Sequence, residues 1–234
     1  MSSELKQCPK CHSSNFWQIK DGRLKCKNCR YLFTPRENIF NISNEILKEV
    51  IGEFLLEHST NIILERVKIS KYKLLKILNN LREILSRDIP EVFEGIISLK
   101  IEPEPIGKDF AIGILAKEGQ VFAKILNIEP QELEEFLKNK ERVGKNENWL
   151  QNFALIYKNS FYRLSPQQSS KIEILEVFWG YLKRKLFTKG GIRKERLHLY
   201  LGEYVWRFNN RKLSLKEKEE KIWKLIMKTQ NLEV

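Results

Sequence analysis

Two pairs of cysteines near the N-terminus constrain the fold of this chain more than any other feature. Cys8 and Cys11 form one C-x-x-C turn, Cys26 and Cys29 form a second, and the chain has no other cysteine. Each such turn aims two sulfur atoms at one point, and two turns complete the tetrahedral four-thiolate site that zinc prefers. The sequence therefore predicts a zinc ribbon over residues 1–36, with zinc in a structural role.

The segment between the two C-x-x-C turns is typical of such a ribbon. It carries short β-prone runs around an Asp21–Gly22 turn. His12 directly follows a cysteine, and we expect it to be a bystander because four cysteines already complete the site. Cations gather around the second turn: Lys20, Arg23, Lys25, Lys27 and Arg30. Two interpretations stay open here, a ribbon that only caps the fold and a ribbon that contacts DNA.

The excess of positive charge indicates which class of partner this chain binds. The formal net charge is +12 and the pI is about 9.5, which favours a polyanion such as nucleic acid over other partners. No apolar run approaches the roughly 20 residues that span a bilayer, and MSSELKQCPK lacks the apolar core of a secretory signal. Cysteines in metal-type pairs fit a reducing compartment. We expect a cytoplasmic, nucleoid-associated protein that does not enter the membrane.

Residues 37–88 show the pattern of a helix-turn-helix. Ser43 is a predicted N-cap for a helix to residue 56, a short helix follows to about residue 67, and Ser70 caps a third helix to about residue 85. The polar positions of the third helix are candidate DNA contacts: Lys71, Lys73, Lys76, Asn79 and Arg82. The alternative is a helical connector whose polar face is only solvated.

The remaining residues, 89–234, predict an α+β domain. Asp88-Ile89-Pro90 marks its start, and β-rich runs follow at 96–102, 110–116 and 121–126. A helix is expected near 130–140, further short strands within 148–164, and charged terminal helices, the last at 216–228 and packed on this domain. The whole chain is thus expected to be an α+β multi-domain protein.

The helix expected from residue 171 carries a possible functional face. Glu176, Trp179 and Lys183 recur at three- and four-residue steps and share one side of it. The Glu176 carboxylate could bind a metal ion, while Lys183 and the following Arg184 could bind a phosphate backbone beside it. The alternative is a surface glutamate paired with a lysine on an amphipathic helix.

Two blocks in this region resemble the end of the catalytic domain of zinc-ribbon DDE transposases of prokaryotic insertion sequences. The first is EVFWGYLKRKL at 176–186, where the family has its third catalytic acid three residues before the tryptophan, at Glu176. The second is LHLYLGEYVWRFNNR at 197–211. It matches the family pattern at these positions: Tyr200, Leu201, Glu203, Tyr204, Arg207, Phe208, Asn209 and Arg211.

The resemblance implies an RNase H-like domain with a mixed sheet and a triad of carboxylates that holds two Mg²⁺ or Mn²⁺ ions. The first acid falls on Glu102 and the second on Glu147, although a shift of one residue would give Asn148. The family has aspartates at both positions, so the triad departs from its pattern. Lys183 and Arg184 would contact DNA, and the protein would act as a homo-oligomer on the ends of an element.

Three hypotheses follow from the sequence. The first is a transposase that binds the duplex ends of an element and performs metal-dependent strand cleavage and transfer through Glu102, Glu147 and Glu176. The second is a transposase-derived DNA-binding protein without catalytic activity. The third is an RNA-binding zinc-ribbon protein, which would prefer structured RNA over duplex DNA.

Overall fold

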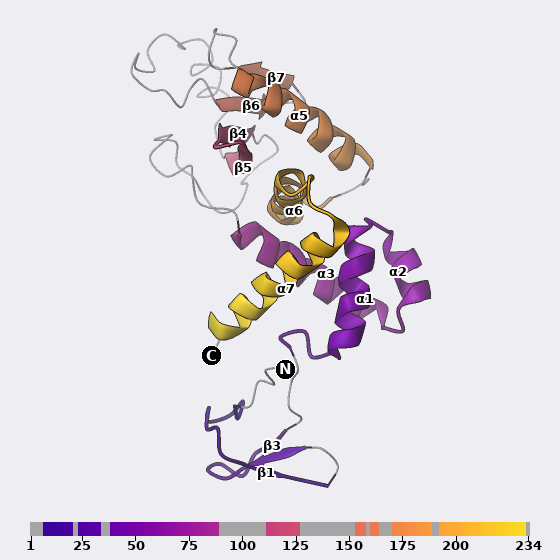
Figure 1. Ribbon diagram of the computed structural model, residues 1–234, viewed down its shortest axis with the longest axis vertical. Helices are drawn as coiled ribbons and strands as arrows, with labels where there is room; N and C mark the ends of the chain where they lie inside the picture. The colour runs from indigo at the N-terminus through magenta and orange to yellow at the C-terminus, as the bar shows by residue number, and fades with distance from the viewer. Residues whose placement is uncertain are drawn as a thin grey trace. The chain divides into compact units, whose positions relative to one another are not determined.

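The computed structural model describes residues 7–20, 23–33, 38–88, 111–126, 153–157, 160–163, 170–188 and 192–232 (Figure 1). These residues form a mixed α/β structure with six α-helices, one 3₁₀-helix and two antiparallel sheets. The chain divides into two compact units, Met1–Leu78 with Ser214–Val234, and Asn79–Leu213.

The N-terminal module is a three-stranded antiparallel sheet in the order β1-β2-β3, made of β1 (Phe16–Gln18), β2 (Leu24–Cys26) and β3 (Leu32–Phe33). Phe16 and Phe33 pack edge to face with ring centroids 5.3 Å apart, on the side of the sheet opposite Trp17. The strands are too short to bury a core. A metal ion bound by its four cysteines would hold this module together. The predicted Asp21–Gly22 turn lies outside the described residues.

Three helices follow: α1 (Asn44–Leu55), α2 (Thr60–Arg66) and α3 (Lys71–Arg87). Each begins at a serine whose hydroxyl accepts a backbone N–H three residues on: Ser43 from Ile46 at 3.3 Å, Ser59 from Ile62 at 3.4 Å and Ser70 from Lys73 at 3.3 Å. These bonds satisfy backbone donors that a helix start leaves without partners. The caps predicted at Ser43 and Ser70 are confirmed.

Helix α7 (Leu215–Leu232) packs against α1, and both helices belong to the same compact unit. It begins with a capping box, in which Ser214 and Glu217 exchange hydrogen bonds between side chain and backbone. Ile222 and Ile226, four residues apart, are fully buried. The expectation that this helix packs on the α+β domain is therefore wrong. Periodicity identified its buried face but contains no information about the partner of that face.

The second sheet has the order β5-β4-β6-β7, from β4 (Ala111–Lys117), β5 (Gln120–Leu126), β6 (Phe153–Tyr157) and β7 (Ser160–Arg163). Glu118 and Gly119 join β4 to β5 with φ of 52° and 76°, as a type I′ hairpin turn requires. All three strand pairs are antiparallel. The described strands thus differ from the mixed sheet expected from the resemblance. The strand expected at 96–102 and the helix at 130–140 lie outside the described residues.

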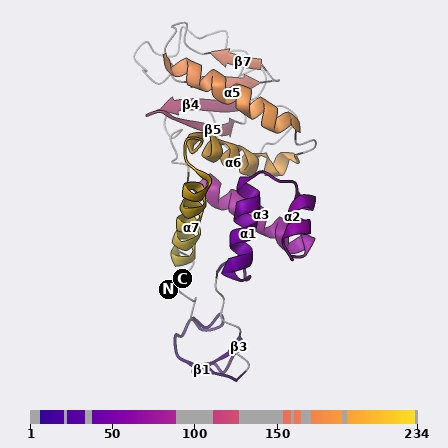
Figure 2. The ribbon, with the colours of Figure 1, turned by 45° about the vertical axis from the view of Figure 1, so that its right-hand side comes forward.

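Helices α5 (Ser170–Thr188) and α6 (Leu197–Asn209) cover one face of this sheet (Figure 2). A 3₁₀-helix, Lys194–Arg196, leads into α6. Alternate residues of the strands point toward the helices and form one apolar core with them: Ile112, Ile114, Ala116, Val121, Ala154, Ile156, Leu175, Phe178, Leu182, Leu201, Tyr204, Val205 and Phe208. Asn209 fixes the end of α6 to β5, because its amide group accepts from the backbone N–H of Val121 at 2.9 Å and donates to its carbonyl at 2.8 Å.

A buried ion-pair cluster joins α6 to the C-terminal half of α3. Glu203 accepts from Nε of Arg82 at 2.7 Å and from Nε of Arg207 at 2.8 Å, and only 2% of its side chain is exposed. The Arg82 guanidinium also lies 4.2 Å from the ring centroid of Tyr200. The two helices approach closely, since a Cβ at Gly202 would lie 2.5 Å from Cβ of Ser86. Glu203 therefore pairs with two guanidiniums at once.

We predict that Glu203→Gln lowers the free energy of unfolding by about 3–5 kcal/mol, because it removes the negative charge that pairs with two buried guanidiniums. The matched control is Glu83→Gln on α3, whose half-exposed carboxylate pairs with Arg87 and should contribute at most about 1 kcal/mol. Urea denaturation at pH 7 measures both. Equal losses in the two variants would contradict the role assigned to Glu203.

Candidate metal centre and nucleic-acid interface

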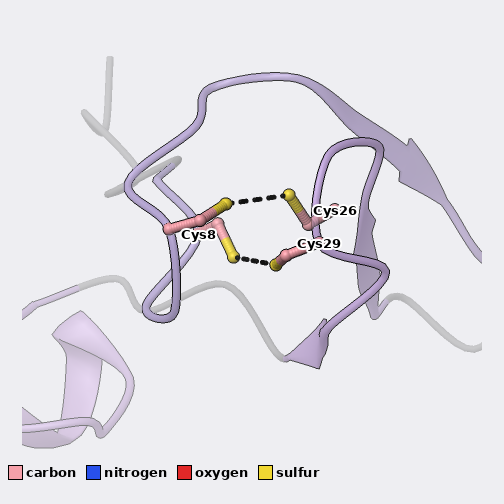
Figure 3. Close-up of side chains that lie close together, drawn as sticks. Cys8, Cys26 and Cys29 are labelled. Atoms are coloured by element: carbon pink, nitrogen blue, oxygen red, sulfur yellow. Dashed lines mark hydrogen bonds between the residues drawn. The ribbon is translucent and has the colours of Figure 1, made fainter.

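The four cysteines predicted to bind zinc converge in the structure. Their sulfur atoms all lie within 4.8 Å of one another. Figure 3 shows sulfurs of the two turns facing each other, with Cys8 Sγ 3.4 Å from Cys29 Sγ and Cys11 Sγ 3.4 Å from Cys26 Sγ. These distances exclude disulfides, in which sulfurs are about 2.05 Å apart. Zinc bonded to four sulfurs at about 2.3 Å needs them roughly 3.8 Å apart, so the cluster fits a tetrahedral zinc ion.

The two C-x-x-C turns have the same backbone geometry. The residue after each second cysteine donates its N–H to the carbonyl of the first, from His12 to Cys8 at 2.8 Å and from Arg30 to Cys26 at 3.1 Å. Both residues have a left-handed backbone, with φ of 56° and 64°. The His12 side chain is exposed and is not part of the sulfur cluster. The structure therefore gives a four-cysteine centre that can hold zinc, without a histidine ligand.

A backbone amide lowers the pKa of the Cys26 thiol. The N–H of Cys29, together with the Cys11 sulfur, lowers the pKa of the Cys26 thiol to about 6. A thiol with this pKa is largely a thiolate at neutral pH, and the thiolate is the form that binds zinc. Among the described residues, these cysteines are the only group of three or more metal-ligating side chains that lie together.

The predicted helix-turn-helix consists of α2, a turn at residues 67–70, and α3. Lys71 and Lys76 are exposed on α3, and Lys73 and Asn79 are partly buried. Tyr72 is 80% exposed at the start of the same helix, and Leu75 is exposed beside it. Sequence reasoning missed Tyr72, although an aromatic residue between two lysines was a signal for it. This surface, defined by Lys71, Tyr72, Lys76 and Asn79, is called the α3 face below.

Arg82 does not belong to the α3 face. It is buried and bound to Glu203, so its guanidinium is not available to a phosphate or a base. The prediction that Arg82 contacts DNA is therefore replaced by a structural role. Helical spacing placed it on the polar side of α3, but its partner lies 121 residues away in the sequence.

Of the three predicted catalytic acids, only Glu176 lies in the part of the chain that the structure describes. Glu176 is exposed on α5, as are Lys183 and Arg184, while Leu175 and Phe178 of the same helix are fully buried in the core. Glu102 and Glu147 lie outside the described residues, as does the alternative Asn148. The structure therefore brings Glu176, Lys183 and Arg184 to the surface of one helix and leaves the predicted Mg²⁺ or Mn²⁺ site as a prediction.

A second feature that sequence reasoning missed is Trp17 of the ribbon, which is 41% exposed. The guanidinium carbon of Arg30 lies 4.6 Å from its ring centroid, and Nζ of Lys27 lies 6.0 Å from it. The sequence signal was the alternation Phe16-Trp17-Gln18, which places the phenylalanine and the tryptophan on opposite faces of a strand.

The comparisons with known proteins place no constraint on the function. No family model matches the chain, and searches of curated proteins and of solved structures gave no significant match. None of the helices in the described part of the chain is both long enough and apolar enough to cross a bilayer.

We predict that the reduced chain binds one zinc ion and that Cys26→Ser sharply lowers the zinc content, since the remaining three cysteines leave the tetrahedral site incomplete. Acidification from pH 8 to pH 5 should release the zinc, because protons compete with the metal for the thiolates. A chromogenic chelator measures both effects. His12→Ala is the control and should keep zinc as the unchanged chain does; loss of zinc in that variant would contradict the four-cysteine assignment.

Proposed function

We propose that this chain is a DNA-binding protein in which the helix-turn-helix presents α3 to the major groove of duplex DNA. The observation that carries the proposal is the α3 face. It begins directly after a short turn, where recognition helices of this motif contact base edges. Its lysines are exposed, and no acidic residue lies between Lys71 and Lys76 in the sequence.

The chemistry of the α3 face suits DNA. Lys71 and Lys76 can neutralise phosphates, and the Asn79 amide has the donor and acceptor needed for an adenine edge. The exposed Tyr72 offers an apolar ring and a hydroxyl at the same surface. A net charge of +12 draws the whole chain toward a polyanion. A cytoplasmic, nucleoid-associated location and assembly into a homo-oligomer on DNA are part of this proposal.

We predict that Lys71→Ala combined with Lys76→Ala weakens duplex binding and makes the slope of log affinity against log salt less steep by about 2, roughly one unit for each lost phosphate contact. Fluorescence anisotropy with a labelled 20-base-pair duplex, titrated at several salt concentrations, measures the slope. The control is Lys224→Ala with Lys228→Ala, which removes the same charge from exposed positions of α7.

Two outcomes would contradict duplex binding by the α3 face. One is an equal change in slope for the α7 control, which would mean that only net charge matters. The other is tighter binding to a structured RNA hairpin than to the duplex at equal salt, which would favour the RNA-binding hypothesis.

The second candidate function is that of a transposase, with DNA cleavage and transfer through Mg²⁺ or Mn²⁺ held by Glu102, Glu147 and Glu176. It is supported by the roles of the residues that carry the resemblance. Glu203 and Arg207 belong to the buried cluster, and Asn209 fixes α6 to β5. The residues that carry the resemblance thus hold α6 in place in this chain, while Glu176 is exposed on the neighbouring helix.

If the chain is a transposase, Glu176→Gln should abolish strand nicking, because the amide cannot replace a charged oxygen ligand of the metal. A labelled duplex carrying the ends of the element, incubated with Mg²⁺ or Mn²⁺ and resolved on a denaturing gel, measures nicking. Glu173→Gln, exposed one turn earlier on α5, is the matched control and should keep activity. Nicking that survives Glu176→Gln would remove this mechanism, and duplex binding without nicking in the unchanged chain would favour the DNA-binding protein without catalysis.

A further inference from the structure

The outer face of the zinc ribbon carries an exposed row of side chains across its three strands. The strand register places Trp17 of β1 opposite Lys25 of β2, and Lys25 opposite Leu32 of β3. All three side chains are exposed. The row spans about 10 Å, the width of three strands. The ribbon thus exposes the aromatic side chain of Trp17 and the apolar side chain of Leu32 on the same face.

Cations surround the indole of Trp17. The Arg30 guanidinium lies against the ring at 4.6 Å and Nζ of Lys27 at 6.0 Å, while Lys25 is its neighbour across the strands. Cation–π attraction holds Arg30 at the ring without using up the hydrogen-bond donors of the guanidinium. The indole ring of Trp17 and the N–H donors of Arg30 thus lie side by side. An aromatic ring can stack on a base, and a guanidinium can bind the phosphate next to it.

The backbone of Arg30 supports a role for its side chain. A φ of 64° is a conformation that glycine adopts freely and that costs other residues about 1 kcal/mol. His12 has the equivalent backbone on the first turn, with φ of 56°. The turn around the metal would therefore accept glycine at either position. At residue 30 it instead carries the side chain that lies on Trp17.

We propose that this face of the ribbon binds unpaired nucleotides, with a base stacked on Trp17 and the adjoining phosphates held by Arg30, Lys25 and Lys27. Bases inside a duplex are stacked on one another and cannot use an aromatic side chain in this way, whereas unpaired bases can. The positive charge around the ring favours a phosphate-bearing ligand over an apolar protein surface. This ligand is distinct from the duplex proposed for the α3 face, and it is bound by different residues.

The test uses the full zinc-loaded chain and a labelled 20-nucleotide oligothymidine, which forms no duplex, in fluorescence anisotropy. Trp17→Ala should weaken binding about 10-fold or more, the loss typical of one stacked base, and Trp17→Phe should restore most of it. Arg30→Gly should weaken binding several-fold and make the salt slope less steep by roughly one unit. The same variant should keep its zinc and its melting temperature, because glycine suits this backbone.

His12→Gly is the matched control, since it makes the same change at the equivalent backbone position, and it should bind the oligonucleotide as the unchanged chain does. Loss of binding in His12→Gly equal to that in Arg30→Gly would overturn the proposal, and so would unchanged binding in Trp17→Ala. If Trp17→Ala loses zinc, Trp17→Phe and Arg30→Gly decide the question, because unchanged affinity in Arg30→Gly is itself contrary evidence.

Two further arms separate this site from the duplex site and identify the strand. Trp17→Ala should bind the 20-base-pair duplex nearly as tightly as the unchanged chain, and the Lys71→Ala, Lys76→Ala variant should keep its affinity for oligothymidine. Loss of both ligands in both variants would mean one shared site and would overturn the proposal. Competition between oligothymidine and oligouridine shows whether the unpaired strand is DNA or RNA.

Discussion

One carboxylate, that of Glu203, joins α6 to the C-terminal half of α3. It forms ion pairs with two buried guanidiniums, and one of them, Arg82, lies on the C-terminal half of α3. Gly202 of α6 lets the two helices approach closely, because any larger side chain at this position would clash with Ser86 of α3. Because Asn209 attaches the same helix to the edge of β5, the interaction passes from α3 through α6 to the sheet. The position of this end of α3 thus depends on a buried ion pair.

What could be derived from the sequence was local. Ser43 and Ser70 cap helices because a hydroxyl at a helix start accepts a neighbouring N–H, and the cysteine turns converge because their spacing dictates it. Features that depend on distant partners could not be derived. Arg82 has the spacing of a surface residue, and its burial follows only from an acid 121 residues later. The partner of α7 and the antiparallel pairing of β4 with β6 are of the same kind.

The α6 segment shows why likeness of sequence and likeness of activity are separate questions. Its matching residues are engaged in holding the fold together: an acid between two cations, an amide bound to a strand edge, and Arg211 donating to the carbonyl of Phe208 at 2.8 Å. Such contacts are needed whether or not metal ions are bound elsewhere. The proposed catalysis would require carboxylates brought to one point, and of the three proposed acids Glu176 has a described position. The duplex binding proposed for the α3 face does not require them.

The equivalence of His12 and Arg30 has a consequence for how this ribbon can change. Both residues follow a metal-binding cysteine, both have the same turn of the backbone, and neither contributes a ligand to the cluster. A substitution at either position changes an exposed side chain of the ribbon and leaves the four-cysteine cluster unchanged. A related chain with other residues at these two positions would keep the four metal-ligating cysteines, while the side chains exposed beside them would differ.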